Sequence, residues 1–149
     1  MRKKTIMPRG WRNHNPLNIR CNEHSTWMGQ NGNDGAFCVF TSLEYGYRAA
    51  FRLLKVYATK YQLYSPCQII SRWAPESDGN NTVAYIRSVC NWVHLSPDDV
   101  LAFGSKVEKE ADLCIEFVRA MASVENGMSP ERIDRKVIER GYQLAFHLN

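Results

Sequence analysis

The side chain best suited to proton transfer lies near the predicted end of a helix, in the segment ASVENGMSP. The negative end of the helix dipole disfavours a charged carboxylate at Glu125. Apolar neighbours at Met121, Val124 and Met128 add partial burial, which raises the pKa of a carboxyl group. A carboxyl group that stays protonated near neutral pH can deliver a proton to a leaving oxygen. Glu125 is therefore the candidate general acid; the alternative is a solvated glutamate before an ordinary Asn-Gly turn.

Two further carboxyl groups compete with Glu125. Glu44 is the rival acid, although it follows Thr41 by three residues, and this capping-box spacing accounts for it without any catalytic role. Asp34 lies in the turn-rich interval QNGNDG, where Asp-Gly is first of all a turn dipeptide. A glycosidase that works with two carboxylates would need such a partner at a defined separation.

Residues 9–37, RGWRNHNPLNIRCNEHSTWMGQNGNDGAF, are dense in amide and indole side chains. Amides beside flat aromatic rings suit a polar, ring-shaped ligand such as a sugar, although turn chemistry alone also recruits Asn, Gly and Pro. Beyond this segment, one tryptophan and one tyrosine in predicted helices could contact a ligand or belong to the core. The substrate-binding candidates are Asn13, Asn15, Asn18, Trp27, Gln30, Trp73 and Tyr85.

The composition describes one globular domain. Of 149 residues, 44% are hydrophobic and 23% charged, which is ordinary for a chain that builds a core. The net charge of +4 allows an anionic partner, but Arg2, Lys3 and Lys4 supply much of it. The remaining arginines are scattered, which disfavours nucleic-acid binding. We expect a flexible basic segment over residues 1–8, one domain over 9–149, and a monomer.

Cofactors, metals and membrane insertion are not expected. The five cysteines are odd in number and lack paired short spacing, which disfavours both a disulfide framework and a zinc site. No segment has the twelve-residue calcium-loop pattern. The basic N-terminus is interrupted by Pro8, Arg9 and Gly10 before any apolar run, so we expect no signal peptide and no membrane span.

The periodicity predicts a mainly α (α+β) fold with one small N-terminal hairpin. The apolar runs STWMG and AFCVF flank a turn-rich interval, so a β-hairpin is expected at about residues 25–40. The chain before residue 20 is expected to be irregular. About six helices follow, each with a start signal such as Ser-Pro, Asn or a capping box. Their expected ranges are 41–61, 65–75, 80–95, 96–103, 105–127 and 129–148.

Three segments resemble parts of the lysozyme-like superfamily. ASVENGMSP looks like the glutamate segment of lytic transglycosylases and related glucosaminidases. NPLNIR, followed by Trp-x-Gly and then Phe-x-Val-Phe-x-Ser, resembles the glucosaminidase branch. NNTVAYIRSV resembles the transglycosylase segment whose tyrosine lies near the catalytic glutamate. Over about residues 9–145, the chain also looks like phage- and prophage-associated proteins predicted to act on peptidoglycan.

The resemblance implies a lysozyme-like domain that cleaves peptidoglycan glycan strands with a single glutamate, as a muramidase, lytic transglycosylase or glucosaminidase. In the lytic families the glutamate helix comes first, whereas Glu125 comes last here. A circular permutation would explain this order, and it predicts that the helix end carrying Glu125 packs beside the NPLNIR turn and the hairpin, with both termini on one side. Such a protein would be made in the cytoplasm and act at the cell wall after release or within a phage particle. The alternative is a catalytically silent phage or mobile-element protein that binds cell-wall polymer.

Overall fold

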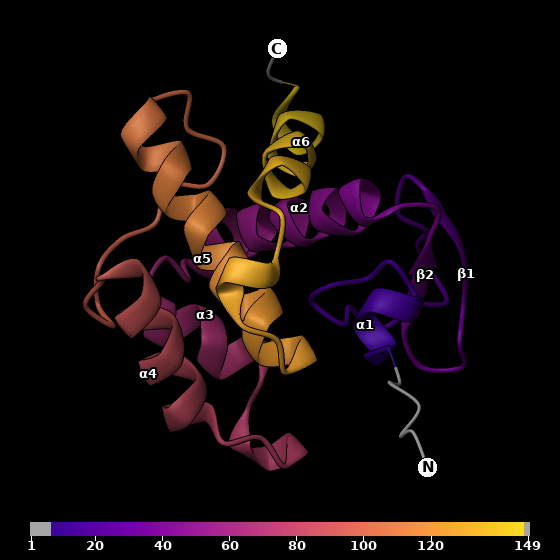
Figure 1. The fold of residues 1–149 in the computed structure, drawn as a ribbon, viewed down its shortest axis with the longest axis horizontal. Helices are drawn as coiled ribbons and strands as arrows, with labels where there is room; N and C mark the ends of the chain where they lie inside the picture. The colour runs from indigo at the N-terminus through magenta and orange to yellow at the C-terminus, as the bar shows by residue number, and fades with distance from the viewer. Residues whose placement is uncertain (1–6, 148–149) are drawn as a thin grey trace.

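The computed structural model describes residues 7–147, which form six α-helices, two short 3₁₀ helices and one two-stranded sheet (Figure 1). This confirms the prediction of a mainly α fold with a small hairpin near the N-terminus. Most of the predicted flexible segment over residues 1–8 lies outside the described residues. The elements are α1 Arg9–Arg12, β1 Gln30–Asn33, β2 Cys38–Phe40, α2 Leu43–Tyr61, α3 Pro66–Trp73, η1 Glu76–Asp78, α4 Thr82–Val93, α5 Glu108–Asn126, η2 Pro130–Arg132 and α6 Arg135–Phe146.

The hairpin lies where the turn-rich interval predicted it. β1 and β2 are antiparallel, with Gln30 opposite Phe40 and Asn33 opposite Cys38, and the register is irregular between these pairs. Cys38 and Phe40 are buried, whereas β1 is largely exposed. The hairpin therefore contributes one strand to the core and leaves the other at the surface.

Helix α5 is the central element, because it contacts α1, α4, α6 and η2. Its middle turns are fully buried at Cys114, Phe117, Val118 and Met121. Burial of side chains of this size on one helix is the main source of stability in a small domain. The end of α5 is therefore held by several neighbours, and this end carries Glu125.

Helices α2 and α6 pack against each other through a glycine. A Cβ atom built on Gly141 would lie 2.5 Å from the Cβ atom of Tyr47 and 3.2 Å from the backbone nitrogen of Arg48. Beside this contact, the rings of Phe51 and Tyr142 meet edge to face at a centroid distance of 5.1 Å. The absence of a side chain at Gly141 thus sets the approach of the two helices.

The predicted helix over residues 96–103 is wrong. Ser96 and Asp99 close a turn, in which the Ser96 backbone nitrogen donates to the Asp99 carboxylate at 2.8 Å. The Leu101 backbone nitrogen donates to the Tyr64 carbonyl at 2.9 Å, and Cys67 donates to Pro97 at 3.0 Å. These long-range backbone bonds replace the hydrogen bonds that a helix would have made within the segment.

Three predicted helix starts also need correction. Ser42, not Thr41, caps α2 by accepting from the Tyr45 backbone nitrogen, so Thr41 and Glu44 form no capping box. Helix α5 begins at Glu108 rather than Ser105. Helix α6 begins at Arg135, with Asp134 as its cap, because the Ser-Pro start at residue 129 leads only into η2. Conversely, residues 9–12 form the short helix α1 where irregular chain was expected.

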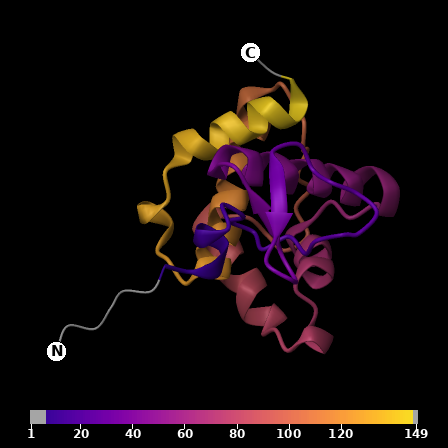
Figure 2. The ribbon, with the colours of Figure 1, turned by 90° about the vertical axis from the view of Figure 1, so that its right-hand side faces the viewer.

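The described chain starts beside α1 and ends with α6, and Figures 1 and 2 place these points at different ends of the molecule. The permutation hypothesis predicted adjacent termini, and this is not found for the ends of the described range, at Met7 and His147. The reason is that α6 runs back along α2 and carries the chain away from α1. Residues 1–6 and 148–149 lie outside the described residues.

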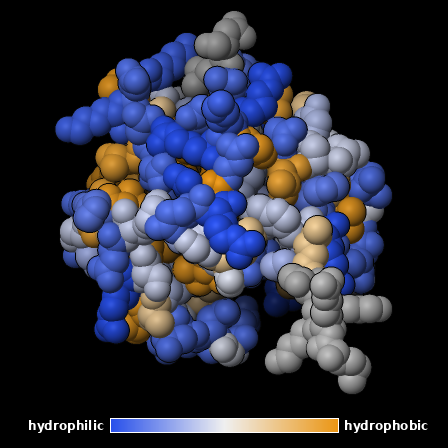
Figure 3. Space-filling view, viewed as in Figure 1, coloured by the Kyte–Doolittle hydropathy of each residue, from blue (hydrophilic) through white to orange (hydrophobic). Residues whose placement is uncertain are grey.

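Among residues 7–147, no helix combines the length and the apolar character needed to cross a membrane. The face shown in Figure 3 is mainly hydrophilic, with hydrophobic residues in small, separate groups.

Candidate functional site

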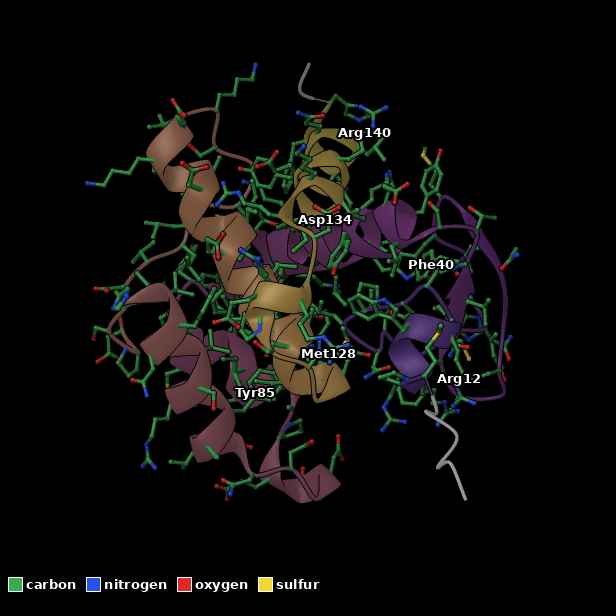
Figure 4. All side chains as sticks on the ribbon, viewed as in Figure 1. Arg12, Phe40, Tyr85, Met128, Asp134 and Arg140 are labelled. Atoms are coloured by element: carbon green, nitrogen blue, oxygen red, sulfur yellow. The ribbon has the colours of Figure 1, made fainter. Side chains whose placement is uncertain are left out.

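Glu125 lies in the last turn of α5 and is bound by side chains from two distant segments. Its Oε1 atom accepts a hydrogen bond from Asn18 Nδ2 at 3.0 Å, and its Oε2 atom accepts one from the Tyr85 hydroxyl at 2.9 Å. Gly127 then ends the helix in the left-handed conformation, with φ 61°. Figure 4 labels Tyr85 on α4 and Met128 just beyond the end of α5. Three residues singled out in the sequence therefore meet at one carboxyl group.

The surroundings of Glu125 favour its neutral form. Burial raises the pKa of the Glu125 carboxyl group above its ordinary value, and the hydrogen bonds from Asn18 and Tyr85 offset only part of this effect. Burial, together with the neighbouring Glu125, raises the pKa of the Tyr85 hydroxyl well above its ordinary value. Tyr85 therefore stays protonated and remains a hydrogen-bond donor.

The Tyr85 hydroxyl can serve both protonation states of Glu125. When Glu125 is ionised, the hydroxyl donates to Oε2 at 2.9 Å. When Glu125 is protonated, the same hydroxyl can accept from it and donate to the Met121 carbonyl, which lies 3.5 Å away. A proton can thus be held or released at Oε2 without leaving a buried polar group unpaired.

Asn15 shapes the turn that presents Asn18. The Asn15 side chain is fully buried and binds only backbone atoms: its Oδ1 atom accepts from the Ile19 nitrogen at 2.9 Å, and its Nδ2 atom donates to the carbonyls of Ile19 and Cys38 at 3.0 Å each. Asn18 itself has φ 52°, a left-handed conformation that asparagine tolerates better than most residues. The Asn15 amide is occupied internally and positions Asn18 rather than facing a ligand.

Asn126 joins this turn to α5, and the sequence analysis missed it. Its Nδ2 atom donates to the Pro16 carbonyl at 2.8 Å across 110 residues of sequence. A Cβ atom on Gly10 would lie 2.5 Å from Asn126 Oδ1, so only glycine fits at that contact. The expected packing of Glu125 beside the NPLNIR turn is present, and Asn126 is one of its causes. In the sequence, Asn126 was indistinguishable from half of a simple Asn-Gly turn.

Trp73 supports the turn from the opposite side. Its Nε1 atom donates to the Leu17 carbonyl at 3.2 Å, and its ring lies 5.8 Å from the ring of Tyr57. The residue immediately before Asn18 is therefore fixed by the indole. Trp73 positions the site through the backbone.

The other predicted binding residues lie in or beside the hairpin, and their amide groups bind side-chain or backbone atoms of the hairpin region. Asn13 Nδ2 donates to Asp34 Oδ2 at 2.8 Å. Gln30 accepts from the Trp27 backbone nitrogen at 3.0 Å and donates to the Gly32 carbonyl at 3.0 Å. The Trp27 side chain packs against the core. In the described part of the chain, no hydrogen bond connects these residues to Glu125, so the structure does not bring them to the carboxyl group.

Neither rival carboxyl group shares the environment of Glu125. Asp34 forms an ion pair with Arg9 at 2.6 Å, and this contact, with the Phe37 nitrogen and Asn13, holds its pKa well below its usual range. Glu44 lies in the first turn of α2, close to Gly141 of α6. Among the carboxyl groups of residues 7–147 with a shifted pKa, Glu125 alone has it raised.

Within residues 7–147, no group of three or more His, Cys, Asp or Glu side chains converges in a way that could hold a metal ion.

Comparison with known proteins shows that the chain is similar to a phage protein. No protein-family model matches the chain. The chain is similar to Protein P5 of Pseudoalteromonas phage PM2, with 35% identity over 143 residues, covering 93% of this chain and 82% of that protein. Because the match leaves out so little of the chain, it must span Asn18, Tyr85 and Glu125.

Proposed function

The chain belongs to the family of Protein P5 from Pseudoalteromonas phage PM2, and we propose that it cleaves the glycan strands of peptidoglycan with Glu125 as the proton donor. The observation that carries this proposal is a carboxyl group with a raised pKa, bound by a tyrosine hydroxyl and an asparagine amide from distant segments. A carboxyl group with a raised pKa that is held by hydrogen bonds from other segments is typical of acid catalysts.

The proposed reaction begins with proton transfer. Protonated Glu125 delivers its proton to the glycosidic oxygen as the bond to the anomeric carbon breaks, and the leaving sugar departs as an alcohol. The carboxylate that remains accepts hydrogen bonds from Asn18 and Tyr85, which stabilise the charge that develops. The anomeric carbon then forms a new bond, either to water in a hydrolase or to a hydroxyl group of the same sugar in a lytic transglycosylase. The proton of that water or hydroxyl group passes to the Glu125 carboxylate and restores the acid. In the lytic transglycosylases that this chain resembles, groups of the substrate replace a second carboxylate. The proposed enzyme is thus a muramidase, lytic transglycosylase or glucosaminidase that uses one catalytic glutamate.

A phage setting supports the choice of substrate. The relative is a phage protein, and a phage must pass the bacterial cell wall on entry or release. We propose that the protein acts at the wall after release or within a particle, as a lysozyme-like monomer. A catalytically silent protein that binds cell-wall polymer would share the fold but would not need the environment of Glu125.

The test is cleavage of peptidoglycan in a zymogram and in a turbidity assay. Glu125→Gln is nearly isosteric and should lower turnover by ~10²–10⁴-fold, the typical contribution of general acid catalysis, while the protein stays folded. Glu44→Gln is the matched control, because Glu44 is also a half-buried helical glutamate but lies beside α6. It should retain activity. Loss of lysis in Glu44→Gln together with activity in Glu125→Gln would show that Glu44, and not Glu125, is the catalytic acid. A wild type that clears no peptidoglycan would favour the binding-only alternative.

A further inference from the structure

Three neighbouring hollows follow the junction of α4 and α5, and the first is lined by Tyr85, which binds Glu125. Its first part is a hollow of about 240 Å³ lined by Tyr85, Ser88 and Val124 among others. The second part, of about 390 Å³, shares Ser88 and Val124 with the first. The third part, of about 360 Å³, shares Trp92 with the second. Because neighbouring hollows share lining residues, they follow one another from the start of α4 to His94 just beyond its end, and this row of hollows is called the groove below.

The groove begins next to the hydrogen-bond partner of the proposed catalytic group. Val124 precedes Glu125 in the chain, and Tyr85 binds the Glu125 carboxyl group at 2.9 Å. Both residues line the first hollow. A ligand in this hollow would therefore contact Tyr85, whose hydroxyl group binds Glu125.

The lining of the first two hollows suits a neutral polar ligand. It includes the amide of Asn91 and the hydroxyl of Ser88, but no charged side chain. Asn80, Asn81 and Ser123 also line these hollows; each makes one hydrogen bond within the protein and keeps further donor or acceptor capacity for a ligand. Amide and hydroxyl groups both donate and accept hydrogen bonds, as do the hydroxyl and acetamido groups of amino sugars. A nucleic-acid backbone would instead require lysine and arginine along the groove. The chemistry of the lining therefore favours a polysaccharide.

Trp92 is held rigidly between the second and third hollows. Its Nε1 atom donates to Glu116 at 3.0 Å, and the guanidinium of Arg119 lies 5.8 Å from the centre of its ring. Glu116 is fixed in turn by Arg135 at 2.8 Å. An aromatic ring whose orientation is fixed before binding loses little entropy when a ligand stacks on it. The half-buried indole lines both hollows, so the part of its ring that faces them can contact the apolar face of a sugar ring.

We infer that this groove binds the continuing glycan strand, with Trp92 stacking on a sugar remote from the bond that is cleaved. The identity of the ligand rests on the proposed function. Helix α4 has 12 residues and is about 18 Å long at 1.5 Å per residue, so the groove exceeds a single sugar ring. The groove gives the protein a preference for long strands over short fragments.

The test measures binding without cleavage, in the Glu125→Gln background, by pelleting with purified insoluble peptidoglycan. Ser88→Trp fills the groove where the first two hollows join and should weaken binding about tenfold or more, the loss typical of a central contact. Arg87→Trp adds the same side chain at the neighbouring exposed position outside the groove, and should bind like its parent. Trp92→Ala should also lose about tenfold, whereas Trp92→Phe should retain most of the binding. Thermal melts of each variant check folding.

The outcomes separate the groove from the catalytic proposal. If Ser88→Trp and Trp92→Ala bind peptidoglycan as well as their parent, the groove is rejected as the binding site for the strand, even when the wild type lyses peptidoglycan. Groove-dependent binding combined with an inactive wild type supports the groove and rejects cleavage. If the parent protein does not pellet with peptidoglycan and the wild type does not lyse it, both proposals are rejected.

Discussion

Asn18 and Glu125 are 107 positions apart in the sequence, and a hydrogen bond of 3.0 Å joins their side chains. Asn18 Nδ2 also lies 3.5 Å from the Glu125 carbonyl. The contact places the NPLNIR turn directly on the end of α5. It is also one of the two bonds that keep the pKa of Glu125 from rising further. Two opposing effects therefore act on the pKa of this carboxyl group: burial favours the protonated acid, and the two hydrogen-bond donors favour the anion.

Tyr85→Phe should move the pH profile of lysis. The Tyr85 hydroxyl lowers the pKa of Glu125, so its removal should raise that pKa further. Since a general acid works in its protonated form, the alkaline limb of kcat/KM should shift to higher pH. Loss of this hydrogen bond should also cost about 1 kcal/mol of stability. Tyr45→Phe is the control, because Tyr45 is a half-buried tyrosine that packs on the hairpin. An alkaline limb that stays in place would contradict the assigned acid.

Glu125→Gln should stabilise the fold increasingly as the pH rises. The folded-state pKa of Glu125 is raised, so its stabilising contribution is present below the unfolded pKa and is lost as pH rises through the folded pKa. Glutamine does not ionise and avoids this loss. The difference in Tm between Glu125→Gln and wild type should therefore be larger at about pH 8 than at about pH 4. This measurement needs no activity.

Glu116→Gln should show the opposite dependence and serves as the matched control on the same helix. Burial acts to raise the pKa of Glu116, but hydrogen bonds from Trp92 and Arg135 and the neighbouring arginines outweigh it and lower the pKa. The stabilising contribution is then present above the unfolded pKa and lost as pH falls through the folded pKa. The wild type should exceed Glu116→Gln in Tm most clearly near neutral pH. Parallel trends for the two variants would contradict the stated environment of Glu125.

Asp34→Asn should leave lysis within a few-fold of wild type. The Asp34 carboxylate is engaged by Arg9 and Asn13, and no hydrogen bond in the described chain links it to Glu125. A second catalytic carboxylate would contribute about 10²-fold or more. Steady-state rates on peptidoglycan decide the matter, and a loss of that size would show that Asp34 takes part in the reaction.

Gly141→Ala should destabilise the fold, although alanine favours helix. The new methyl group would lie 2.5 Å from the Tyr47 Cβ atom, so α2 and α6 must move apart. Overpacking of this kind costs ~1–3 kcal/mol, against a gain of about 1 kcal/mol in helix propensity. Arg140→Ala changes the neighbouring exposed position, labelled in Figure 4, and should leave Tm nearly unchanged. Equal Tm values for both variants would contradict the close helix contact.

Signals between near neighbours in the chain could be predicted from the sequence. Ser65 caps α3 with Pro66 in its first turn, Asn81 caps α4, and Gly127 ends α5, all as the sequence indicated. The hairpin also follows from apolar runs around a turn. These features depend on side chains bonding to backbone a few residues away, so short segments contain the necessary information.

Only the tertiary structure decided which polar side chains meet Glu125. Asn15 and Asn18 look alike in the sequence, yet Asn15 is consumed by backbone bonds within its own loop and hairpin, and Asn18 reaches α5. The same holds for Asn126, whose bond to Pro16 closes the site, and for residues 96–103, which bond to the α3 region instead of forming a helix. Each outcome depends on a partner far along the chain. Local pattern cannot choose among such partners, because the choice is made by the packing that brings them within hydrogen-bond distance.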